Sequence, residues 1–432
     1  LASAFESALA RIIEGCMKQV PVLTASDGSV GGLTQAAYAA ILDKQGIRAE
    51  DVEAFWEATP MQAGILYHSL QHRHRGDYCD QVRQVVRGRL DPDKFEAAWR
   101  EVVKRHGVLR SGFWMEGWDV PIQVVFRTRD ADFRKHDLSG LSLEAQQARC
   151  LELAILDRNE GFDPVRQSLL RLTLIQLSDD THEWILNLHH SILDGWSAGL
   201  VMDECLSIYT ASVREKPLVL PDPVSFERFV RYRQAQSEDA AIAYWKDLLA
   251  DGAQGVLPPF GCSTWIDDAD GVGYVACRVG TERCSSISKC AQEWGTTPNV
   301  LMQATWALWL QAALGVDDVV FGATVSGRDI QEVADIERIV GLLINTIPVR
   351  VRDEGRTLRE CVDALSRQSA QSREHGHLSL ADIQVLAGSR DLIQHAFIFE
   401  NHPSEADREQ DSLLRIETVG VQDPMHFDFG LL

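Results

Sequence analysis

The sequence predicts an α+β protein with two units, because helical and strand patterns follow one another in both halves of the chain. In the first half, residues 169–177 and 183–188 are apolar stretches around the polar turn SDDTH, which predicts an antiparallel hairpin. In the second half, a helical stretch at 299–314 precedes strand patterns at 318–325 and 341–349. Each half therefore combines a sheet with helices that cover it.

The first fifty residues stand apart from these patterns. Residues 3–16 predict an amphipathic helix, because apolar side chains recur on one side of it. A polar loop rich in glycine and a short helix at 35–44 follow. We expect residues 1–50 to be the tail of a preceding domain plus a linker. Since the sequence does not start with Met, we also expect it to be a piece of a longer protein.

A helix is predicted over residues 92–106. Asp91 is a good N-cap and Pro92 suits the first helical turn. One face of this helix is expected to be buried, since it carries Phe95, Trp99, Val102 and His106.

The composition excludes several classes of function. The 432-residue chain has a formal net charge of −21, which argues against nucleic acid and anionic membranes as partners. Its nine cysteines form no C-x-x-C pair and fit reduced thiols in the cytoplasm better than a disulfide framework. No apolar run approaches about 18 residues, so no transmembrane helix is expected.

The most informative stretch is NLHHSILDGWS, residues 187–197. An apolar strand runs into His189 and His190, and Asp194-Gly195 follows at the expected start of a helix. A neutral imidazole at a strand end can accept a proton near pH 7. A glycine N–H at a helix N-terminus can bind a developing oxyanion. The plainer alternative is that the histidines only end a strand and the aspartate only caps a helix.

Further segments favour the first interpretation. HHSILDGWS matches the pattern HHxxxDG, and the chain resembles the condensation domains of nonribosomal peptide synthetases, in which this pattern is central. Other segments resemble the flanking motifs of that family in the same order: TPMQAGILYHSL (59–70), RHGVLRSGFW (105–114), VGLLINTIPVR (340–350), HGHLSLADIQ (375–384) and FIFENHP (397–403).

The resemblance implies two lobes that are each similar to chloramphenicol acetyltransferase and form a V-shaped pseudo-dimer with a central tunnel. We expect the N-terminal lobe at 51–230 and the C-terminal lobe at 231–432. Three prolines between residues 215 and 235 suit the crossover between them. Since the family continues beyond HFDFGLL, the second lobe is expected to be incomplete at its end.

The implied reaction joins an upstream acyl or peptidyl thioester to the α-amine of a downstream aminoacyl thioester. Both substrates are expected to be attached to phosphopantetheine arms of carrier proteins. No cofactor is expected on the domain itself. A thioester is already activated, and an α-amino group has a pKa of only about 7.7–8.0. Bringing the two tethered groups together is therefore expected to supply most of the acceleration.

The resemblance also assigns roles to residues. His190 is expected to hydrogen-bond the attacking amine, either as general base or as an orienting acceptor. His189 is expected to support it, and Gly195 is the candidate backbone donor.

Five further residues are expected around this site. Asp194 is expected to be structural and to form an ion pair with Arg110 of the RHGVLR segment. Asn345, Trp196 and Ser197 are expected at the tunnel and its floor.

No metal site is expected. The segment HRHR at 72–75 and the pair His375 and His377 have no cysteine or carboxylate partners at metal-ligand spacing. We predict that both are solvated loops.

Several alternatives share the HHxxxD arrangement. They are a coenzyme A-dependent acyltransferase, an epimerisation domain, a heterocyclisation domain and a noncatalytic docking module. Heterocyclisation domains have aspartates in place of the histidines, and docking modules tend to lose the second histidine or the glycine.

The expected partners are an upstream donor and a downstream acceptor carrier protein, with adenylation and epimerisation domains as neighbours. The segments TPMQAGILYHSL and HGHLSLADIQ resemble the branch of the family that receives a D-configured donor. Residues 3–16 resemble the last helix of an epimerisation domain, which would supply that donor.

Overall fold

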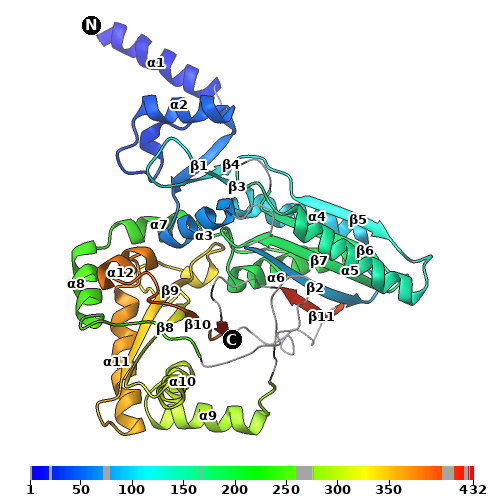
Figure 1. Cartoon of the computed structure of the whole chain (residues 1–432). Helices are drawn as coiled ribbons and strands as arrows, with labels where there is room; N and C mark the ends of the chain where they lie inside the picture. The colour runs from blue at the N-terminus through cyan, green and yellow to red at the C-terminus, as the bar shows by residue number, and fades with distance from the viewer. Residues whose placement is uncertain are drawn as a thin grey trace. The chain divides into compact units, whose positions relative to one another are not determined.

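The computed structural model describes residues 2–18, 22–71, 78–165, 168–258, 275, 277–400, 413–422, 427 and 429–432 (Figure 1). The HRHR segment lies outside these residues. Contacts divide the chain into two compact units. Unit 1 comprises Leu1–Gln234, Val333–Leu342 and Arg408–Gln422, and unit 2 comprises Ala235–Glu332, Leu343–Asp407 and Asp423–Leu432. The chain thus changes unit near residue 234, and two later segments return to unit 1.

Unit 1 contains seven of the described α-helices and eight of the described strands. The helices are α1 (Ala2–Lys18), α2 (Gln35–Gln45), α3 (Pro60–Gln71), α4 (Pro92–Arg105), α5 (Leu143–Glu160), α6 (Gly195–Val213) and α7 (Glu227–Gln234). The strands are β1 (Val52–Glu57), β2 (Cys79–Arg87), β3 (Ser111–Trp114), β4 (Ile122–Phe126), β5 (Asp132–Asp137), β6 (Leu170–Gln176), β7 (Thr181–His189) and β11 (Arg415–Gln422).

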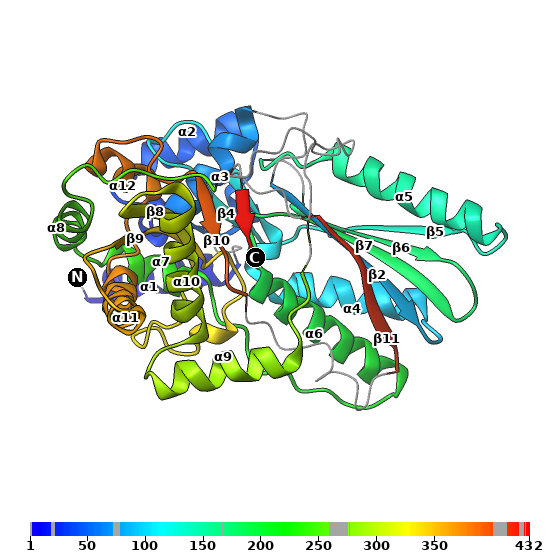
Figure 2. The same cartoon turned by 60° about the horizontal axis from the view of Figure 1, so that its bottom comes forward.

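A five-stranded sheet in the order β11-β2-β7-β6-β5 is the centre of unit 1 (Figure 2). The predicted hairpin is confirmed, since β6 and β7 pair antiparallel with Leu170 opposite Leu188. Helices cover both faces of the sheet. Phe95 of α4 stacks on Trp184 at 5.3 Å on one face, and Gln81 donates to the carbonyl of Ala154 in α5 on the other.

Helix α4 forms for the reasons that the sequence indicates. The Asp91 side chain accepts from the backbone N–H groups of Asp93 and Lys94, which satisfies two donors that the first turn leaves open. The predicted apolar face is buried, and Trp99 is fully inaccessible. The helix ends at Arg105, and His106 is its buried C-cap.

A second sheet of unit 1, in the order β1-β4-β3, packs against α2. Tyr38 of α2 stacks on Phe55 of β1 at 4.8 Å, and both are buried beside Trp114. Part of the segment that precedes residue 51 therefore contributes to the core of this unit.

The predicted amphipathic helix at the start of the chain is α1. Four apolar side chains of this helix are exposed: Phe5, Leu9, Ile12 and Ile13. Nothing in the described residues covers this side of the helix to the degree typical of a core.

Unit 2 contains a four-stranded sheet in the order β12-β10-β8-β9. Its strands are β8 (Asp318–Val325), β9 (Asn345–Arg352), β10 (His395–Phe397) and β12 (Phe429–Leu431). Its helices are α8 (Glu238–Leu248), α9 (Thr281–Glu293), α10 (Pro298–Leu314), α11 (Leu358–Glu374) and α12 (Leu380–Ala387). Side chains from α10, α11, β8 and β9 form its main apolar core.

Three buried histidines make stability depend on pH. Burial lowers the pKa of His182 and of His395, and it lowers the pKa of His189 to about 3. Below the ordinary histidine pKa of about 6.5, the unfolded chain binds protons that the folded chain does not. We therefore expect full stability above pH 6.5 and a progressive loss below it, which approaches about 1.4 kcal/mol per pH unit for His189 and has the same sign for His182 and His395.

Chemical denaturation at pH 7.5, 6.5 and 5.5 measures this dependence. His182→Phe is the matched variant, because both ring nitrogens of His182 are buried and have no hydrogen-bond partner among the residues that the structure describes. Because the variant removes one of the three histidines, the free energy of unfolding is expected to decline less steeply between pH 6.5 and 5.5. A free energy of unfolding that rises between pH 6.5 and 5.5 would contradict the prediction.

Candidate active site

The candidate site lies where β7 ends and α6 begins. Strand β7 pairs with β2 up to the Cys79–His189 pair, and the His190 backbone N–H then donates to the Tyr78 carbonyl at 2.9 Å. Asp194 is the N-cap of α6 and accepts from the Ser197 backbone N–H at 2.8 Å. The residues between them form a short loop held at both ends.

His189 is buried and neutral. Only 2% of it is exposed, and burial together with the neighbouring His190 lowers its pKa to about 3. Its Nδ1 accepts from the Ser191 backbone N–H at 3.3 Å, so the proton resides on Nε2, 3.1 Å from the Ser69 hydroxyl. This ring cannot serve as a base for an outside substrate, because both nitrogens are committed.

His190 has the opposite tautomer. Its Nδ1 lies 2.9 Å from the Leu193 carbonyl oxygen and 3.2 Å from the Asp80 carboxylate. Both groups can only accept, so Nδ1 must carry a proton. The lone pair of the neutral imidazole is then on Nε2. The side chain is 22% exposed, which fits a ring that meets a substrate.

Gln62 of α3 binds the loop between His190 and Asp194 through a hydrogen bond to its backbone. It is fully buried, and its amide donates to the Ser191 carbonyl at 2.8 Å and to Gln123 at 2.9 Å. Sequence reasoning did not single out Gln62 or Asp80. Gln62 could have been proposed from its place in the TPMQ segment, which resembles a family motif. No sequence pattern around Asp80 points to a role in the site.

The expected ion pair between Asp194 and Arg110 is wrong. The Arg110 guanidinium binds Glu53 at 2.7 Å and also donates to backbone carbonyls, including Val103 and Phe126. Its donors are therefore committed to Glu53 and the carbonyls. Asp194 is buried and acts as the cap of α6. A motif gives the sequence position of a charged residue but not which of several carboxylates it reaches.

Gly195, Trp196 and Ser197 form the first turn of α6. Gly195 is exposed, and its N–H belongs to the helix end that lacks intrahelical partners. Trp196 Nε1 donates to the Glu337 carbonyl at 2.9 Å. The buried Ser197 hydroxyl donates to the Gly341 carbonyl at 2.8 Å and accepts from the Gly341 N–H at 3.0 Å. These two side chains thus fasten the segment Val333–Leu342 to the start of α6.

Asn345 lies in unit 2, at the start of β9. It is 5% exposed, and its amide donates to the Gly376 carbonyl at 2.7 Å. Its oxygen accepts from the Thr346 backbone N–H at 3.0 Å. These bonds tie the strand to the turn after α11.

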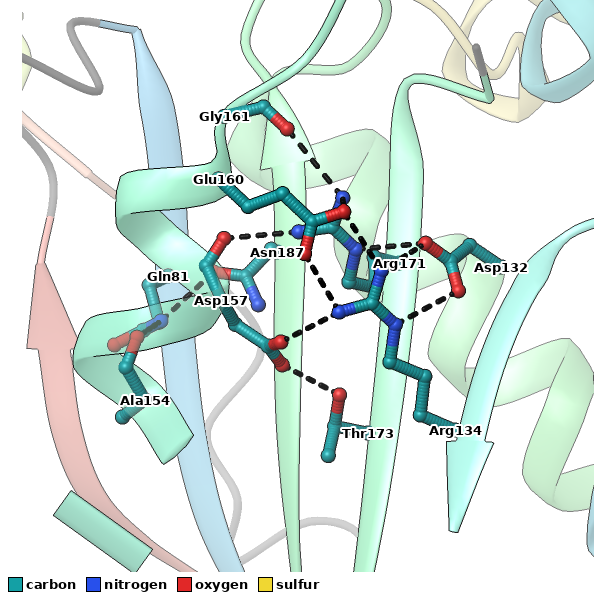
Figure 3. A network of polar contacts seen from close by, with 10 residues as sticks. All are labelled: Gln81, Asp132, Arg134, Ala154, Asp157, Glu160, Gly161, Arg171, Thr173 and Asn187. Atoms are coloured by element: carbon teal, nitrogen blue, oxygen red, sulfur yellow. Dashed lines mark hydrogen bonds and ion pairs between the residues drawn. The ribbon is translucent and has the colours of Figure 1, made fainter. Parts of the chain in front are cut away.

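A network of charges lies on the face of the sheet that α5 covers (Figure 3). Arg171 and Arg134 each bind Asp132 and Glu160, at distances of 2.7–3.0 Å. Hydrogen bonds from Arg134 hold the pKa of Glu160 below its usual range. Arg171 also lies over the Phe162 ring at 5.1 Å, and that ring meets His189 edge-on. The network thus supports the buried side of the site.

The described residues lack two further kinds of feature. None of their helices has both the length and the apolar character needed to cross a membrane. They also contain no group of three or more histidine, cysteine or acidic side chains that could hold a metal ion.

Comparisons with known proteins identify the family of the chain. Residues 52–430 match the family model described as condensation domain. Bacitracin synthase 1 of Bacillus licheniformis is 31% identical over 440 residues, which cover 100% of this chain and 8% of the synthase. A linear gramicidin synthase of Brevibacillus parabrevis is 33% identical over 403 residues, which cover 92% of this chain and 5% of that synthase. The chain therefore spans less than a tenth of either relative.

Solved structures share the fold. The first condensation domain of the calcium-dependent antibiotic synthetase, bound to a substrate analogue, superposes with a TM-score of 0.65 at 20% identity, covering 84% of each chain. The X-domain in complex with OxyB from teicoplanin biosynthesis has a TM-score of 0.68 at 21% identity, covering 89% of this chain and 84% of that chain.

The chain has an α+β fold in which the HHxxxDG loop follows strand β7 and leads into helix α6. The chain belongs to the condensation-domain family of the nonribosomal peptide synthetases, whose reaction is amide-bond formation.

Proposed function

We propose that this domain transfers an acyl or peptidyl group from an upstream carrier protein to the α-amine of an aminoacyl group on a downstream carrier protein. The observation that carries the proposal is the tautomer of His190, whose Nδ1 is committed to two acceptors and whose Nε2 lone pair can meet an amine. His189 cannot take this role, because it is buried with both nitrogens engaged.

In the proposed reaction the amine nitrogen bonds to the thioester carbonyl carbon and the carbon–sulfur bond breaks. One proton leaves the amine for His190 Nε2 and then passes to the departing thiolate of the phosphopantetheine arm. The Gly195 N–H, at the positive end of α6, is the proposed donor to the oxyanion. A thioester needs no further activation, so positioning supplies most of the acceleration.

The partners are part of the proposal. The donor and acceptor carriers bring both substrates, and adenylation and epimerisation domains are the proposed neighbours. The exposed apolar side of α1 supports a neighbouring domain on that helix. Seven cysteines whose side chains the structure describes are free thiols, which supports a reducing, cytoplasmic setting. Asn345 and the Val333–Leu342 segment are proposed to belong to the tunnel and its floor.

One assay tests the proposed function. Both carriers are loaded, the domain is added, and intact-protein mass spectrometry follows the downstream carrier. The expected product is the extended thioester on that carrier, with a free thiol on the upstream one. Hydrolysis of the donor without transfer, or epimerisation of the donor with no mass change, would favour the alternatives instead.

The donor is proposed to end in a D-configured residue. Inverting the configuration of the α-carbon exchanges its side chain and its hydrogen. A site whose shape fits the D configuration therefore holds the thioester of an L-configured donor in a displaced position. A displacement of about 1 Å can cost on the order of 10²-fold in a positioned reaction. A competition between two carrier-bound donors that differ only in the hand of the last residue measures this. We expect the D form to be used preferentially, and preferential use of the L form would overturn the assignment.

A further inference from the structure

Asp80 contacts the nitrogen of His190 that faces away from the proposed substrate. It is the second residue of β2 and pairs with Leu188 of β7 across the sheet. Because His190 continues directly from β7 and its N–H is held by the Tyr78 carbonyl, its ring lies against the start of β2. There Asp80 Oδ2 lies 3.2 Å from Nδ1.

The backbone at this point is held in an unusual conformation. Tyr78 has a φ of +64°, in the left-handed region that side chains other than glycine adopt at a cost of roughly 1–3 kcal/mol. The residue is 3% exposed and its ring stacks on His68. The packing of Tyr78 thus fixes both the carbonyl that binds His190 and the start of the strand that carries Asp80.

The carboxylate of Asp80 is poorly satisfied apart from this contact. Its side chain is 18% exposed, and its Oδ1 is buried without a hydrogen-bond partner among the described residues. A buried carboxylate oxygen that lacks a donor lowers the stability of the folded state. When His190 takes up a proton on Nε2, its ring becomes a positively charged neighbour of Asp80 Oδ2, which partly offsets this cost.

The other titratable groups around this pair do not replace Asp80. His189 is neutral and lies beside His190. The Cys79 thiol next to Asp80 has its pKa raised to about 12, by burial first and then by the Asp80 charge. Arg171, Arg158 and Asp157 also act on this thiol, so their charges reach the start of β2.

We propose that Asp80 is a positioning residue for the condensation reaction, which keeps His190 in the Nδ1–H tautomer and stabilises the imidazolium formed when the amine gives up its proton. This inference rests on the proposed function. No bond to Asp80 forms or breaks in this step. The proton moves from the amine to His190 Nε2 and then to the thiolate, and none is transferred to the carboxylate. The neutral Leu193 carbonyl orients the ring in both states, whereas the Asp80 charge favours the protonated one.

The test replaces the charge and keeps the shape. Asp80→Asn is compared with the wild type in single-turnover condensation between loaded carriers and in an NMR titration of His190, assigned with His190→Gln. An opposite charge at this distance favours the charged imidazole, and both side chains are partly exposed, so we expect the His190 pKa to fall by about 1 unit. The maximal rate is expected to fall about tenfold, with KM unchanged and the acidic limb of the pH profile, which reports the proton acceptor, moved to lower pH.

Two variants serve as controls. Asp130→Asn removes the same charge from an almost fully exposed side chain of unit 1 and is expected to change neither the titration nor the rate. Asp80→Glu keeps the charge and is expected to retain the His190 pKa and to hold the rate within about threefold of the wild type.

An unchanged His190 pKa in Asp80→Asn would overturn the inference, as would a Glu variant that retains the pKa and is as slow as the Asn variant. If Asp80→Asn does not fold, the Glu variant decides alone: a Glu variant that retains the His190 pKa but is about tenfold slower than the wild type would overturn the inference. If the wild type makes no condensation product, the proposed function fails, while the titration still decides whether Asp80 stabilises the protonated ring.

Discussion

Replacement of His190 by alanine is expected to lower the rate of condensation by about 10²–10⁴-fold, the range typical of a positioned proton acceptor. The variant removes the only imidazole of the pair whose tautomer presents a lone pair to a substrate. Its stability is expected to stay close to that of the wild type, because the side chain is partly exposed and at the end of a strand.

His136→Ala is the matched control, since it removes a half-buried histidine from β5 of the same unit. It is expected to leave the rate within about twofold of the wild type. Single-turnover mass spectrometry measures both variants, and melting temperatures check that both fold. A folded His190→Ala domain with nearly normal turnover would show that the ring neither accepts the proton nor positions the amine.

Replacement of Arg171 by methionine is expected to cost about 3–5 kcal/mol of unfolding free energy. Only 2% of the Arg171 side chain is exposed, and its guanidinium binds Asp132 and Glu160 and donates to the Asp157 carbonyl. Methionine fills the space but leaves the carboxylates of Asp132 and Glu160, which among the described residues then pair only with Arg134 (Figure 3).

The control for this prediction is Arg149→Met in α5, which removes a half-exposed arginine paired with Glu152. Exposed pairs contribute about 0–1 kcal/mol, so this variant is expected to unfold close to the wild type. Denaturant unfolding at pH 7.5 compares the two. Equal stabilities of the two variants would mean that the network in Figure 3 contributes no more than a surface pair.

The parts of the fold that were predictable are those that short-range patterns determine. The β6–β7 hairpin follows from two apolar runs around a polar turn. Helix α4 follows from the Asp91 cap and a single apolar face. The HHxxxDG loop was recognised because its seven residues are contiguous in the sequence.

Pairings over long sequence distances were not predictable. Strand β11 lies beside β2, more than 300 residues away, and its mostly exposed side chains carry no clear strand pattern. The segment Val333–Leu342 returns to unit 1 through backbone and hydroxyl contacts such as Ser197–Gly341, which no local pattern encodes.

The same limit explains one wrong pairing and one missed residue in the site. The Arg110 partner depends on how β1 places Glu53, and the Asp80–His190 contact depends on the register between β2 and β7. A one-residue change of register would turn Asp80 to the other face of the sheet. Such contacts become visible only when the strands are in place.

The protonation of the neutral His190 ring is the most direct test of the account. Nitrogen-15 NMR of the domain labelled at histidine distinguishes a protonated ring nitrogen from one with a lone pair, and His190→Gln identifies the signals. We predict that the neutral His190 ring carries its proton on Nδ1 and that Nε2 has the lone pair, while His189 shows the reverse. A His190 ring that carries its proton on Nε2 in the neutral state would contradict the proposed role of this residue in accepting the amine proton.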